Sequence, residues 1–446
     1  MKRDIQPKLV DFITSRSIKE TLIIEGARQV GKSYLVSSAL SDCGVPFKSF
    51  DLEKEPRLLG HINQTTSFAD FRQLMEDRYD IKPGTILFID EAQEAPVLAK
   101  YIKSFKEDWP DVKVLLSGSS MSRLFDTPVR IPVGRMRSMC VFGFSFSEFA
   151  RYIAGDDLAD FLNSAPEKIE PSRHDYLLEL FDHYCKVGGY PEAVKAFKNN
   201  ESFMEIIENI YFSLADDFRR KEEYQPALFD NTVTAIANYI GMPFKLTAID
   251  TTKYRAKHIL EALNAWHLAI EVRQHALDPT HSSFLPKRYL HDIGVCNMKR
   301  SIAAPSLSLL NTIDPLLRKP LGGLFENALA ISLYNGESAS KSIGTWKKSS
   351  GNVIEVDFIL DYPEKGVKIP IECKAALVAK KKHCTNVRHY LENTGQRFGI
   401  VASAAPLACI MDTGCRHIIN IPIYLCSKEN IRTYFDRGME GLTIGT

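Results

Sequence analysis

The sequence predicts an α/β fold in which residues 1–150 form a parallel sheet covered by helices. Short apolar runs alternate with helical stretches over this part of the chain, which is the pattern expected of strand–helix–strand units. A glycine-containing segment follows the first apolar run, Leu22–Ile24, and leads into a helical stretch. A later run over 85–91 ends in two acidic residues. Both features fall at the carboxyl edge of the predicted sheet, where open α/β sheets bind their ligands.

The segment after the first predicted strand matches the phosphate-binding loop of nucleotide-binding proteins. It consists of Gly26, Ala27, Arg28, Gln29, Val30, Gly31, Lys32 and Ser33. The glycines let backbone N–H groups turn toward a triphosphate, the lysine reaches its outer phosphates, and the serine hydroxyl ligates magnesium. By chance such a pattern occurs in roughly one chain in a hundred, so its place behind a strand is what makes it persuasive. The sequence therefore predicts a site for ATP and Mg²⁺.

The acidic pair Asp90–Glu91 supplies the second half of this site. It closes a short apolar run, Thr85–Ile89, that is typical of a fully buried strand. We expect Asp90 to hold the magnesium ion through water and Glu91 to orient or deprotonate the attacking water. Acidic residues also follow strands as helix caps, but a preceding phosphate-binding loop favours the catalytic interpretation. The pair therefore predicts hydrolysis of ATP in addition to binding.

Two further groups are candidates for the same site. A third predicted strand, Val112–Ser117, leads into Gly118, Ser119 and Ser120, and the Ser119 hydroxyl is expected to sense the γ-phosphate, with helix capping as the alternative. Arg135 and Arg137 have no acidic neighbours in the sequence. Such an arginine suits a cation that stabilises the transition state, supplied in cis or by the neighbouring subunit of a homo-oligomer. A solvated surface arginine is the alternative.

Taken together, these motifs resemble those of prokaryotic AAA-type ATPases that carry an uncharacterised C-terminal domain. The similarity covers most of the chain and includes the segment FSFSEF at 144–149. It implies an AAA+-like core and a C-terminal domain similar to the PD-(D/E)xK nuclease fold. Many AAA+ proteins place an asparagine at the sensor position, where this chain has Gly118, Ser119 and Ser120. The resemblance therefore extends neither to the sensor nor to a standard hexameric motor.

Composition limits the classes of function. With 446 residues, of which 45% are hydrophobic and 25% charged, the chain is expected to form about three soluble domains. The net charge is +1, so any surface that binds nucleic acid must be local. No apolar run is long enough to span a bilayer and the N-terminus has no signal core, so a cytoplasmic location without a membrane partner is expected.

The cysteines do not form a recognisable metal motif. There are nine of them at irregular positions without a Cys-x-x-Cys pair, so we expect reduced and mostly buried thiols. His383, Cys384 and His389 lie close in sequence, but the steps between His389 and the other two do not place them on one helix face. The spacing therefore predicts no zinc site.

The middle of the chain is predicted to form two helical parts. Residues 151–225 are expected to be a helical lid or connector, and residues 226–300 a winged-helix-like module. The second prediction rests on a helix, a turn and a basic helix followed by two β-rich stretches. The basic helix carries Lys253, Arg255 and Lys257, which we expect to contact DNA phosphates. The alternative is an interdomain module whose basic face is merely solvated.

Residues 301–446 combine acidic residues with one lysine in a second constellation. Glu326 lies in an otherwise apolar helical stretch, and a buried acid needs a partner. Asp357 lies on a predicted strand over 353–360, and the next strand opens with Glu372 and Lys374 on one face. This spacing resembles the PD-(D/E)xK pattern, with Glu326 matching the upstream helical acid of that superfamily.

The chemistry of this constellation follows from its residue types. Three carboxylates would hold one or two Mg²⁺ or Mn²⁺ ions that polarise a scissile phosphate, while Lys374 would position or activate the attacking water. Ordinary salt bridges are the alternative. The complete prediction is an ATP-hydrolysing protein that couples nucleotide state to a DNA-facing C-terminal half, a restriction-endonuclease-like α/β domain with a metal-dependent nuclease site.

Two alternatives remain open at this point. One is a nucleotide-dependent switch whose nuclease-like domain is inactive and only binds nucleic acid or protein. The other is a signalling or defence ATPase with protein clients, in which the winged-helix-like module is a spacer. The choice between DNA and RNA and the oligomeric state are not set by the sequence.

Overall fold

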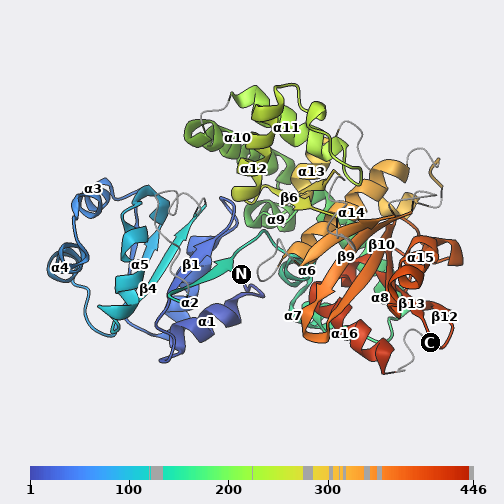
Figure 1. The fold of residues 1–446 in the computed structure, drawn as a ribbon, viewed down its shortest axis with the longest axis horizontal. Coiled ribbons are helices and arrows are strands. Elements are labelled where there is room, and N and C mark those ends of the chain that lie inside the picture. The colour runs from blue at the N-terminus through green and yellow to red at the C-terminus, as the bar shows by residue number, and fades with distance from the viewer. Residues whose placement is uncertain are drawn as a thin grey trace. The chain divides into compact units, whose positions relative to one another are not determined.

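The structure is a computed structural model of the chain, shown in Figure 1. It describes residues 1–119, 121, 134–222, 225–274, 285–300, 305–310, 312–314, 318–335, 342–348 and 354–440. The chain divides into two compact units. The first comprises Met1–Phe142 with Ala265–His267, and the second comprises Gly143–Asn264 with Leu268–Thr446. The boundaries of the four domains proposed from the sequence stay a prediction.

The first unit is built on a five-stranded sheet with the strand order β2-β3-β4-β1-β5. All of its strand pairs are parallel, as the alternation of strands and helices in the sequence predicts. The strands are β1 (Thr21–Glu25), β2 (Phe47–Asp51), β3 (Ile86–Asp90), β4 (Lys113–Gly118) and β5 (Met136–Cys140). The helices are α1 (Gln6–Thr14), α2 (Lys32–Cys43), α3 (Pro56–Gln64), α4 (Phe68–Tyr79), α5 (Leu98–Glu107) and the 3₁₀ turn η1 (Ala92–Glu94).

The central strands of this sheet read as continuous apolar runs because both of their faces are covered. Every residue of β3 is buried, and the side chains of Leu87, Ile89 and Leu116 join a core with Phe71 and Phe105 from the helices. Parallel strands that are buried on both faces show this pattern instead of strict alternation. Since the strands are parallel, β1, β3 and β4 all end at the same edge of the sheet, which is where the polar residues follow.

The second unit begins with a helical part that also contains a two-stranded antiparallel ribbon. Over residues 226–300, the helices α11 and α12 are followed by the short strands β6 and β7, the order that the sequence predicts for this segment. The helices are α6 (Phe146–Ala154), α7 (Asp156–Asn163), α8 (Pro171–Val187), α9 (Pro191–Lys198), α10 (Phe203–Glu222), α11 (Pro226–Asn238), α12 (Lys253–Ala265) and α13 (Ile293–Lys299), and the strands are β6 (Ala269–Val272) and β7 (Lys287–Leu290). Short 3₁₀ turns lie at η3 (Leu246–Ala248) and η5 (Leu307–Leu309).

A buried aspartate joins the end of α8 to the start of α13. Asp292 accepts a hydrogen bond from Gly189 N at 2.7 Å and one from Val295 N at 2.8 Å, which caps α13. A Cβ atom on Gly188 would lie 2.5 Å from Asp292 Oδ1, and one on Gly294 would lie 2.6 Å from the carbonyl oxygen of Val187. The backbones therefore meet without side chains between them, and Gly188 ends α8.

The rest of the second unit is an α/β part with a six-stranded mixed sheet in the order β12-β13-β11-β10-β9-β8. Only the β10–β11 and β11–β13 pairs are parallel. The strands are β8 (Ile343–Lys347), β9 (Glu355–Tyr362), β10 (Val367–Lys374), β11 (Phe398–Ser403), β12 (Ala408–Asp412) and β13 (His417–Pro422). The helices are α14 (Arg318–Tyr334), α15 (Thr385–Thr394) and α16 (Lys428–Met439), with 3₁₀ turns η8 (Pro363–Lys365), η9 (Lys381–Cys384) and η10 (Ile423–Leu425).

Within the described ranges, every helix is too short or too polar to cross a membrane.

Candidate functional site

The phosphate-binding loop lies between β1 and α2, as predicted, and its glycines are required by the backbone. Gly26 has a φ of 150°, and a Cβ atom there would lie 1.9 Å from the carbonyl oxygen of Val141. Gly31 begins α2 with a φ of 86° in the left-handed region, which costs a residue with a side chain far more than glycine. Both positions thus need glycine for reasons independent of any ligand.

The Lys32 side chain is buried in the loop itself. Its Nζ donates hydrogen bonds to the carbonyl oxygens of Gly26 at 2.9 Å and Ala27 at 2.8 Å. Burial lowers the pKa of Lys32 to about 8, although the nearby charges of Glu91 and Asp90 act in the opposite direction. A phosphate group in the loop would compete with the two carbonyls for the ammonium protons and would restore the positive charge.

Asp90 ends β3 and accepts hydrogen bonds from two hydroxyl groups. The Ser33 hydroxyl donates to Asp90 Oδ2, and the Ser117 hydroxyl, from the end of β4, donates to Oδ1. The structure therefore brings the two predicted magnesium ligands, Ser33 and Asp90, into direct contact. The oxygen donors that Mg²⁺ prefers are all present in this set, so the residues fit that ion. Sequence reasoning missed Ser117, which lies 27 residues away from Asp90.

Glu91 follows in a left-handed backbone conformation, with a φ of 51°. Burial raises the pKa of its carboxyl group, which makes the carboxylate a stronger base. The side-chain amide of Gln93 donates a hydrogen bond to Glu91 Oε2 and fixes its orientation. Gly118 makes room for Gln93, because a Cβ atom at Gly118 would lie 1.9 Å from Gln93 Oε1. Neither Gln93 nor this role of Gly118 was predicted.

Ser119 comes directly after β4, at the same edge of the sheet. Its hydroxyl is buried, and no hydrogen-bond partner for it lies in the described part of the chain. A buried hydroxyl without a partner is costly, so a ligand oxygen at this position would satisfy it. The neighbouring Ser120 lies outside the described residues.

Arg135 and Arg137, which have no acidic neighbours in the sequence, each lie near a carboxylate in the fold. Arg135 pairs with Glu107 at 2.8 Å, and Arg137 lies 3.8 Å from Glu20. Moreover, Arg135 directly precedes β5, and its carbonyl oxygen accepts a hydrogen bond from Thr21 at the start of β1. The phosphate-binding loop follows the other end of β1. Arg135 is therefore at the opposite edge of the sheet, where it cannot serve the nucleotide of its own chain without a large movement.

Two arginines that the sequence did not single out by role support the loop. Arg3 is buried and donates to the carbonyl oxygens of Val30 at 3.0 Å and Phe142 at 2.7 Å. Arg28 within the loop forms an ion pair with Glu53, which follows β2. Arg3 lies too far from the loop in sequence for any local pattern to reveal it.

In the second unit, a buried lysine lies at the centre of the predicted acidic constellation. Lys287 Nζ is 3.0 Å from Glu326 Oε1, 2.8 Å from Glu355 Oε1 and 3.1 Å from Asp357 Oδ1. Its side chain is 2% exposed. The three carboxylates outweigh the cost of burial and hold the pKa of Lys287 well above its ordinary range. Two of the three predicted acids, Glu326 and Asp357, are thus brought together, but around a cation that belongs to the protein.

Glu372 and Lys374, the remaining members of the constellation, form an ion pair of their own. Lys374 Nζ lies 2.6 Å from Glu372 Oε1, and Asn386 donates to the same oxygen at 3.0 Å. Burial, together with the charge of Asp357, raises the pKa of Glu372 to about 8. The second oxygen of Asp357 is taken by the backbone N–H of Cys373 at 2.9 Å.

This arrangement does not fit a divalent metal ion. An ion held by Glu326 and Asp357 would have to lie next to the Lys287 ammonium, with three positive charges in one buried space. The expectation of Mg²⁺ or Mn²⁺ among these carboxylates is therefore at odds with the geometry. The sequence does not predict that Lys287 joins these carboxylates, because β7 belongs to a part of the chain that was expected to be a separate module.

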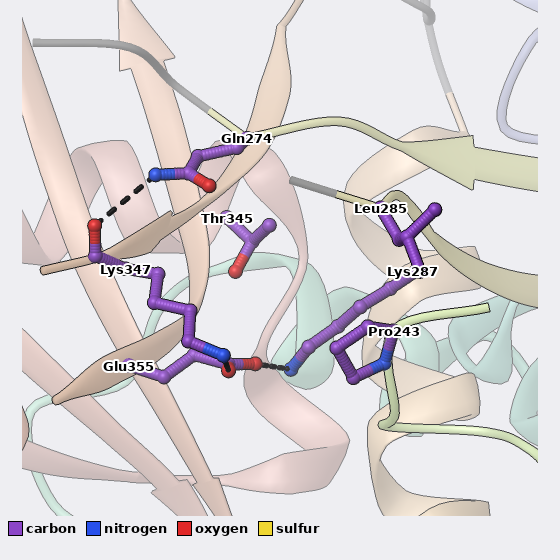
Figure 2. Close-up of a pocket in the computed structure, with 7 residues that line it drawn as sticks. All are labelled: Pro243, Gln274, Leu285, Lys287, Thr345, Lys347 and Glu355. Atoms are coloured by element: carbon purple, nitrogen blue, oxygen red, sulfur yellow. Dashed lines mark hydrogen bonds and ion pairs between the residues drawn. The ribbon is translucent and has the colours of Figure 1, made fainter. Parts of the chain in front are cut away.

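A pocket of about 260 Å³ opens beside this cluster. Figure 2 shows Lys287 and Glu355 pointing toward each other across it, with Lys347 close to the same carboxylate. Its lining residues are Pro243, Gln274, Leu285, Lys287, Thr345, Lys347 and Glu355. Within this wall, Glu355 pairs with both lysines, and Gln274 donates a hydrogen bond to the carbonyl oxygen of Lys347.

The three basic residues predicted to contact DNA lie on the first half of α12. Lys253, Arg255 and Lys257 are exposed, while Ala256, Ile259, Leu260 and Leu263 on the same helix are buried. Lys257 lies 3.7 Å from Glu261 one turn further on. The basic face is therefore available on the surface, and its contact with DNA stays a prediction.

Comparison with protein families identifies one part of the chain. Residues 19–150 match a family model described as AAA domain. The N-terminal unit thus contains an AAA domain of the P-loop ATPase type. A second model, described as a domain of unknown function (DUF8612), matches residues 178–306. This description assigns no activity, so the winged-helix-like and nuclease-like interpretations stay proposals. No curated protein matches the sequence.

Several solved structures show a distant likeness to the chain. The Walker-type ATPase PABY2304 of Pyrococcus abyssi is 15% identical, with 67% of this chain and 95% of that chain covered and a TM-score of 0.43. The RuvB Holliday junction branch migration motor of Thermotoga maritima is 14% identical over 61% and 90% of the two chains, with a TM-score of 0.31. Drosophila ORC bound to DNA is 12% identical over 63% and 90%, with a TM-score of 0.30. At these scores the assignment rests on the family model, the sheet and the loop.

Proposed function

We propose that the AAA domain of this chain binds ATP with Mg²⁺ and hydrolyses it. The observation that carries this proposal is the contact of Ser33, from the phosphate-binding loop, with Asp90 at the end of the buried strand β3. Lys32 would bind the outer phosphates, and Ser33 and Asp90 would hold the magnesium ion. The ion would draw the phosphate oxygens together and neutralise the charge that develops on them.

Glu91 is the proposed general base. Its raised pKa makes it a better proton acceptor for the attacking water than an exposed glutamate, and Gln93 holds it in place. Ser119 would sense the γ-phosphate through its unsatisfied hydroxyl. If Arg135 acts as an arginine finger, its place at the far edge of the sheet requires a neighbouring subunit, and so a homo-oligomer.

Two variants test this assignment. Lys32→Ala is expected to lose affinity for ATP, while Glu91→Gln is expected to bind ATP and to hydrolyse it at least 100-fold more slowly. Glu94→Gln, three residues further along, is the matched control and should turn over ATP like the parent. Equal turnover by Glu91→Gln and the parent would refute the role of Glu91.

We propose that the protein is a nucleotide-dependent switch, in which the first unit binds the nucleotide and the second unit binds nucleic acid without cutting it. The support is the Lys287 ammonium, which occupies the centre of the acidic cluster where a catalytic metal would have to bind. Lys253, Arg255 and Lys257 are the proposed contacts to DNA phosphates, because they are exposed on one helix. In this proposal a winged-helix-like module binds DNA and the nuclease-like domain is inactive.

A metal-dependent nuclease is the second candidate. It is favoured by the convergence of Glu326 and Asp357 on neighbouring elements, with Glu372 and Lys374 on the next strand. The two candidates are separated by incubating plasmid and linear DNA with the protein, with and without ATP and Mn²⁺. Metal-dependent cutting that is lost in Lys374→Ala would establish the nuclease, and DNA-stimulated ATP hydrolysis without cutting would establish the switch.

A further inference from the structure

We infer that Glu25, Cys140 and His267 form a binding site for a zinc-type divalent ion at the base of the phosphate-binding loop. Of the described residues, these three are the group whose potential ligand atoms all lie within 4.8 Å of one another. They come from three separate places: the end of β1, the end of β5, and the segment 265–267 that packs with the first unit. This scattering explains why spacing along the sequence predicted no zinc site.

The distances agree with a shared ion. Cys140 Sγ lies 3.2 Å from Glu25 Oε1, and His267 Nε2 lies 3.7 Å from Glu25 Oε2. Ligands of a tetrahedral zinc ion, at bond lengths near 2.0–2.3 Å, are about 3.4–3.6 Å apart. Small rotations of the three side chains would therefore suffice to bind an ion, without movement of the backbone.

The donor set indicates which ion would bind. A thiolate, an imidazole and one carboxylate suit Zn²⁺ and related borderline ions, whereas Mg²⁺ prefers oxygen ligands alone. Three protein ligands leave the fourth position to water. The site is also accessible, since the Glu25 side chain is 28% exposed and that of His267 is 13% exposed.

Binding would be accompanied by release of a proton. The Cys140 thiol donates a hydrogen bond to Glu25 Oε1 at 3.2 Å and therefore carries a proton when no ion is bound. The metal ion displaces this proton to solvent and forms a bond to the resulting thiolate, while Glu25 and His267 supply lone pairs. The thiolate and the carboxylate then balance the two positive charges of the ion.

An ion bound at this site would lie next to the start of the phosphate-binding loop. Glu25 is followed directly by Gly26, whose Cα approaches Val141 so closely that a side chain would not fit. Cys140 is the residue before Val141. His267 is held with a φ of 55°, which is uncommon for a residue other than glycine. An ion at this site would tie the segment 265–267 to the strand that carries the phosphate-binding loop.

The test uses Co²⁺ as a spectroscopic probe on the full chain, after treatment with a chelator and without nucleotide. The parent is expected to bind one Co²⁺ with the near-ultraviolet charge-transfer band of a thiolate ligand, and Zn²⁺ should displace it. Cys140→Ser should lose the band. His267→Gln should keep the thiolate band but bind Co²⁺ at least tenfold more weakly. Removing a residue that only supports a metal ligand typically lowers metal affinity about 10–100-fold, and removing a ligand itself should lower it at least as much.

Cys43→Ser is the matched control, because Cys43 is also a partly buried free thiol in the first unit. It should bind Co²⁺ like the parent. Thermal melts of each apo-variant check that it is folded, and His267→Gln provides an independent arm should Cys140→Ser unfold. A parent without the band, or a band that persists in folded Cys140→Ser, would overturn the proposal. In either case the three residues form only a hydrogen-bonded cluster.

Discussion

Replacing Lys287 by methionine tests whether the acidic cluster of the second unit is built around a protein cation. The substitution keeps the length of the side chain but leaves three carboxylates, those of Glu326, Glu355 and Asp357, without the ammonium that now lies 2.8–3.1 Å from each of them. Removing one partner of a buried ionic cluster typically costs about 3–5 kcal/mol, because uncompensated charge stays buried.

The expected shift in melting temperature follows from this cost. For units of more than about 200 residues, each kcal/mol lowers the Tm by roughly 2 °C, so Lys287→Met should melt about 6–10 °C below the parent. Its stability should rise as the pH is lowered. Carboxyl groups whose pKa values are raised in the folded state stabilise it when protonated, and that stabilisation is lost as the pH rises. Burial already raises the pKa of Glu326 in the parent.

The decisive comparison adds Mn²⁺ to both proteins. In Lys287→Met the three carboxylates no longer face a fixed cation, so Mn²⁺ at 100 times its dissociation constant should restore about 2.7 kcal/mol. The parent should gain nothing at this site. Lys365→Met, which removes an exposed lysine that lies 3.5 Å from Asp436, is the control and should cost less than about 1 kcal/mol. Equal stabilisation of parent and Lys287→Met by Mn²⁺ would contradict the reasoning.

Three further predictions concern the first unit and α12. Burial lowers the pKa of Lys32 to about 8, so at higher pH the binding of ATP must return a proton to this lysine. The Kd for ATP measured by calorimetry should therefore rise about eightfold between about pH 8.5 and 9.5; a constant Kd would contradict this. Arg3→Ala removes two charge-assisted hydrogen bonds to carbonyls that flank the loop, so denaturant unfolding should show a loss of about 3 kcal/mol, with exposed Arg16→Ala near zero as control. Reversing Lys253 and Lys257 to glutamate should weaken duplex binding and its salt dependence without changing ATP affinity; unchanged fluorescence anisotropy would make the helix a spacer.

The parts of the ATPase site that are local in sequence could be predicted, because local patterns encode them. The loop from Gly26 to Ser33 needs glycines at fixed offsets, and Asp90 and Glu91 close an apolar run that is long enough to identify as a strand. Parallel pairing then brings the two segments to one edge, as the contact between Ser33 and Asp90 illustrates. Both patterns are typical of a site that binds phosphate and magnesium.

The supporting residues could not be predicted, because their partners are distant in sequence. Arg3 contacts Phe142 across 139 positions, and Lys287 contacts Asp357 across 70. Neither residue lies in a motif, and a basic residue in a strand such as β7 suggests an exposed face until the fold buries it. The sequence also failed to show that Arg135 has an acidic partner, because Glu107 lies on α5.

The close backbone contact at Asp292 has a consequence for how force passes through the helical part of the second unit. The turn after α8 and the start of α13 meet without a side chain between their backbones. The Asp292 carboxylate accepts hydrogen bonds from the backbone N–H groups of Gly189 in that turn and of Val295 in α13. The two helices therefore cannot slide past each other by exchanging rotamers, as packed helices usually can. A rotation of α8 is therefore expected to move the start of α13 with it. Substitution of Gly188, Gly189 or Gly294 should accordingly be tolerated far less than substitution of the larger residues around them.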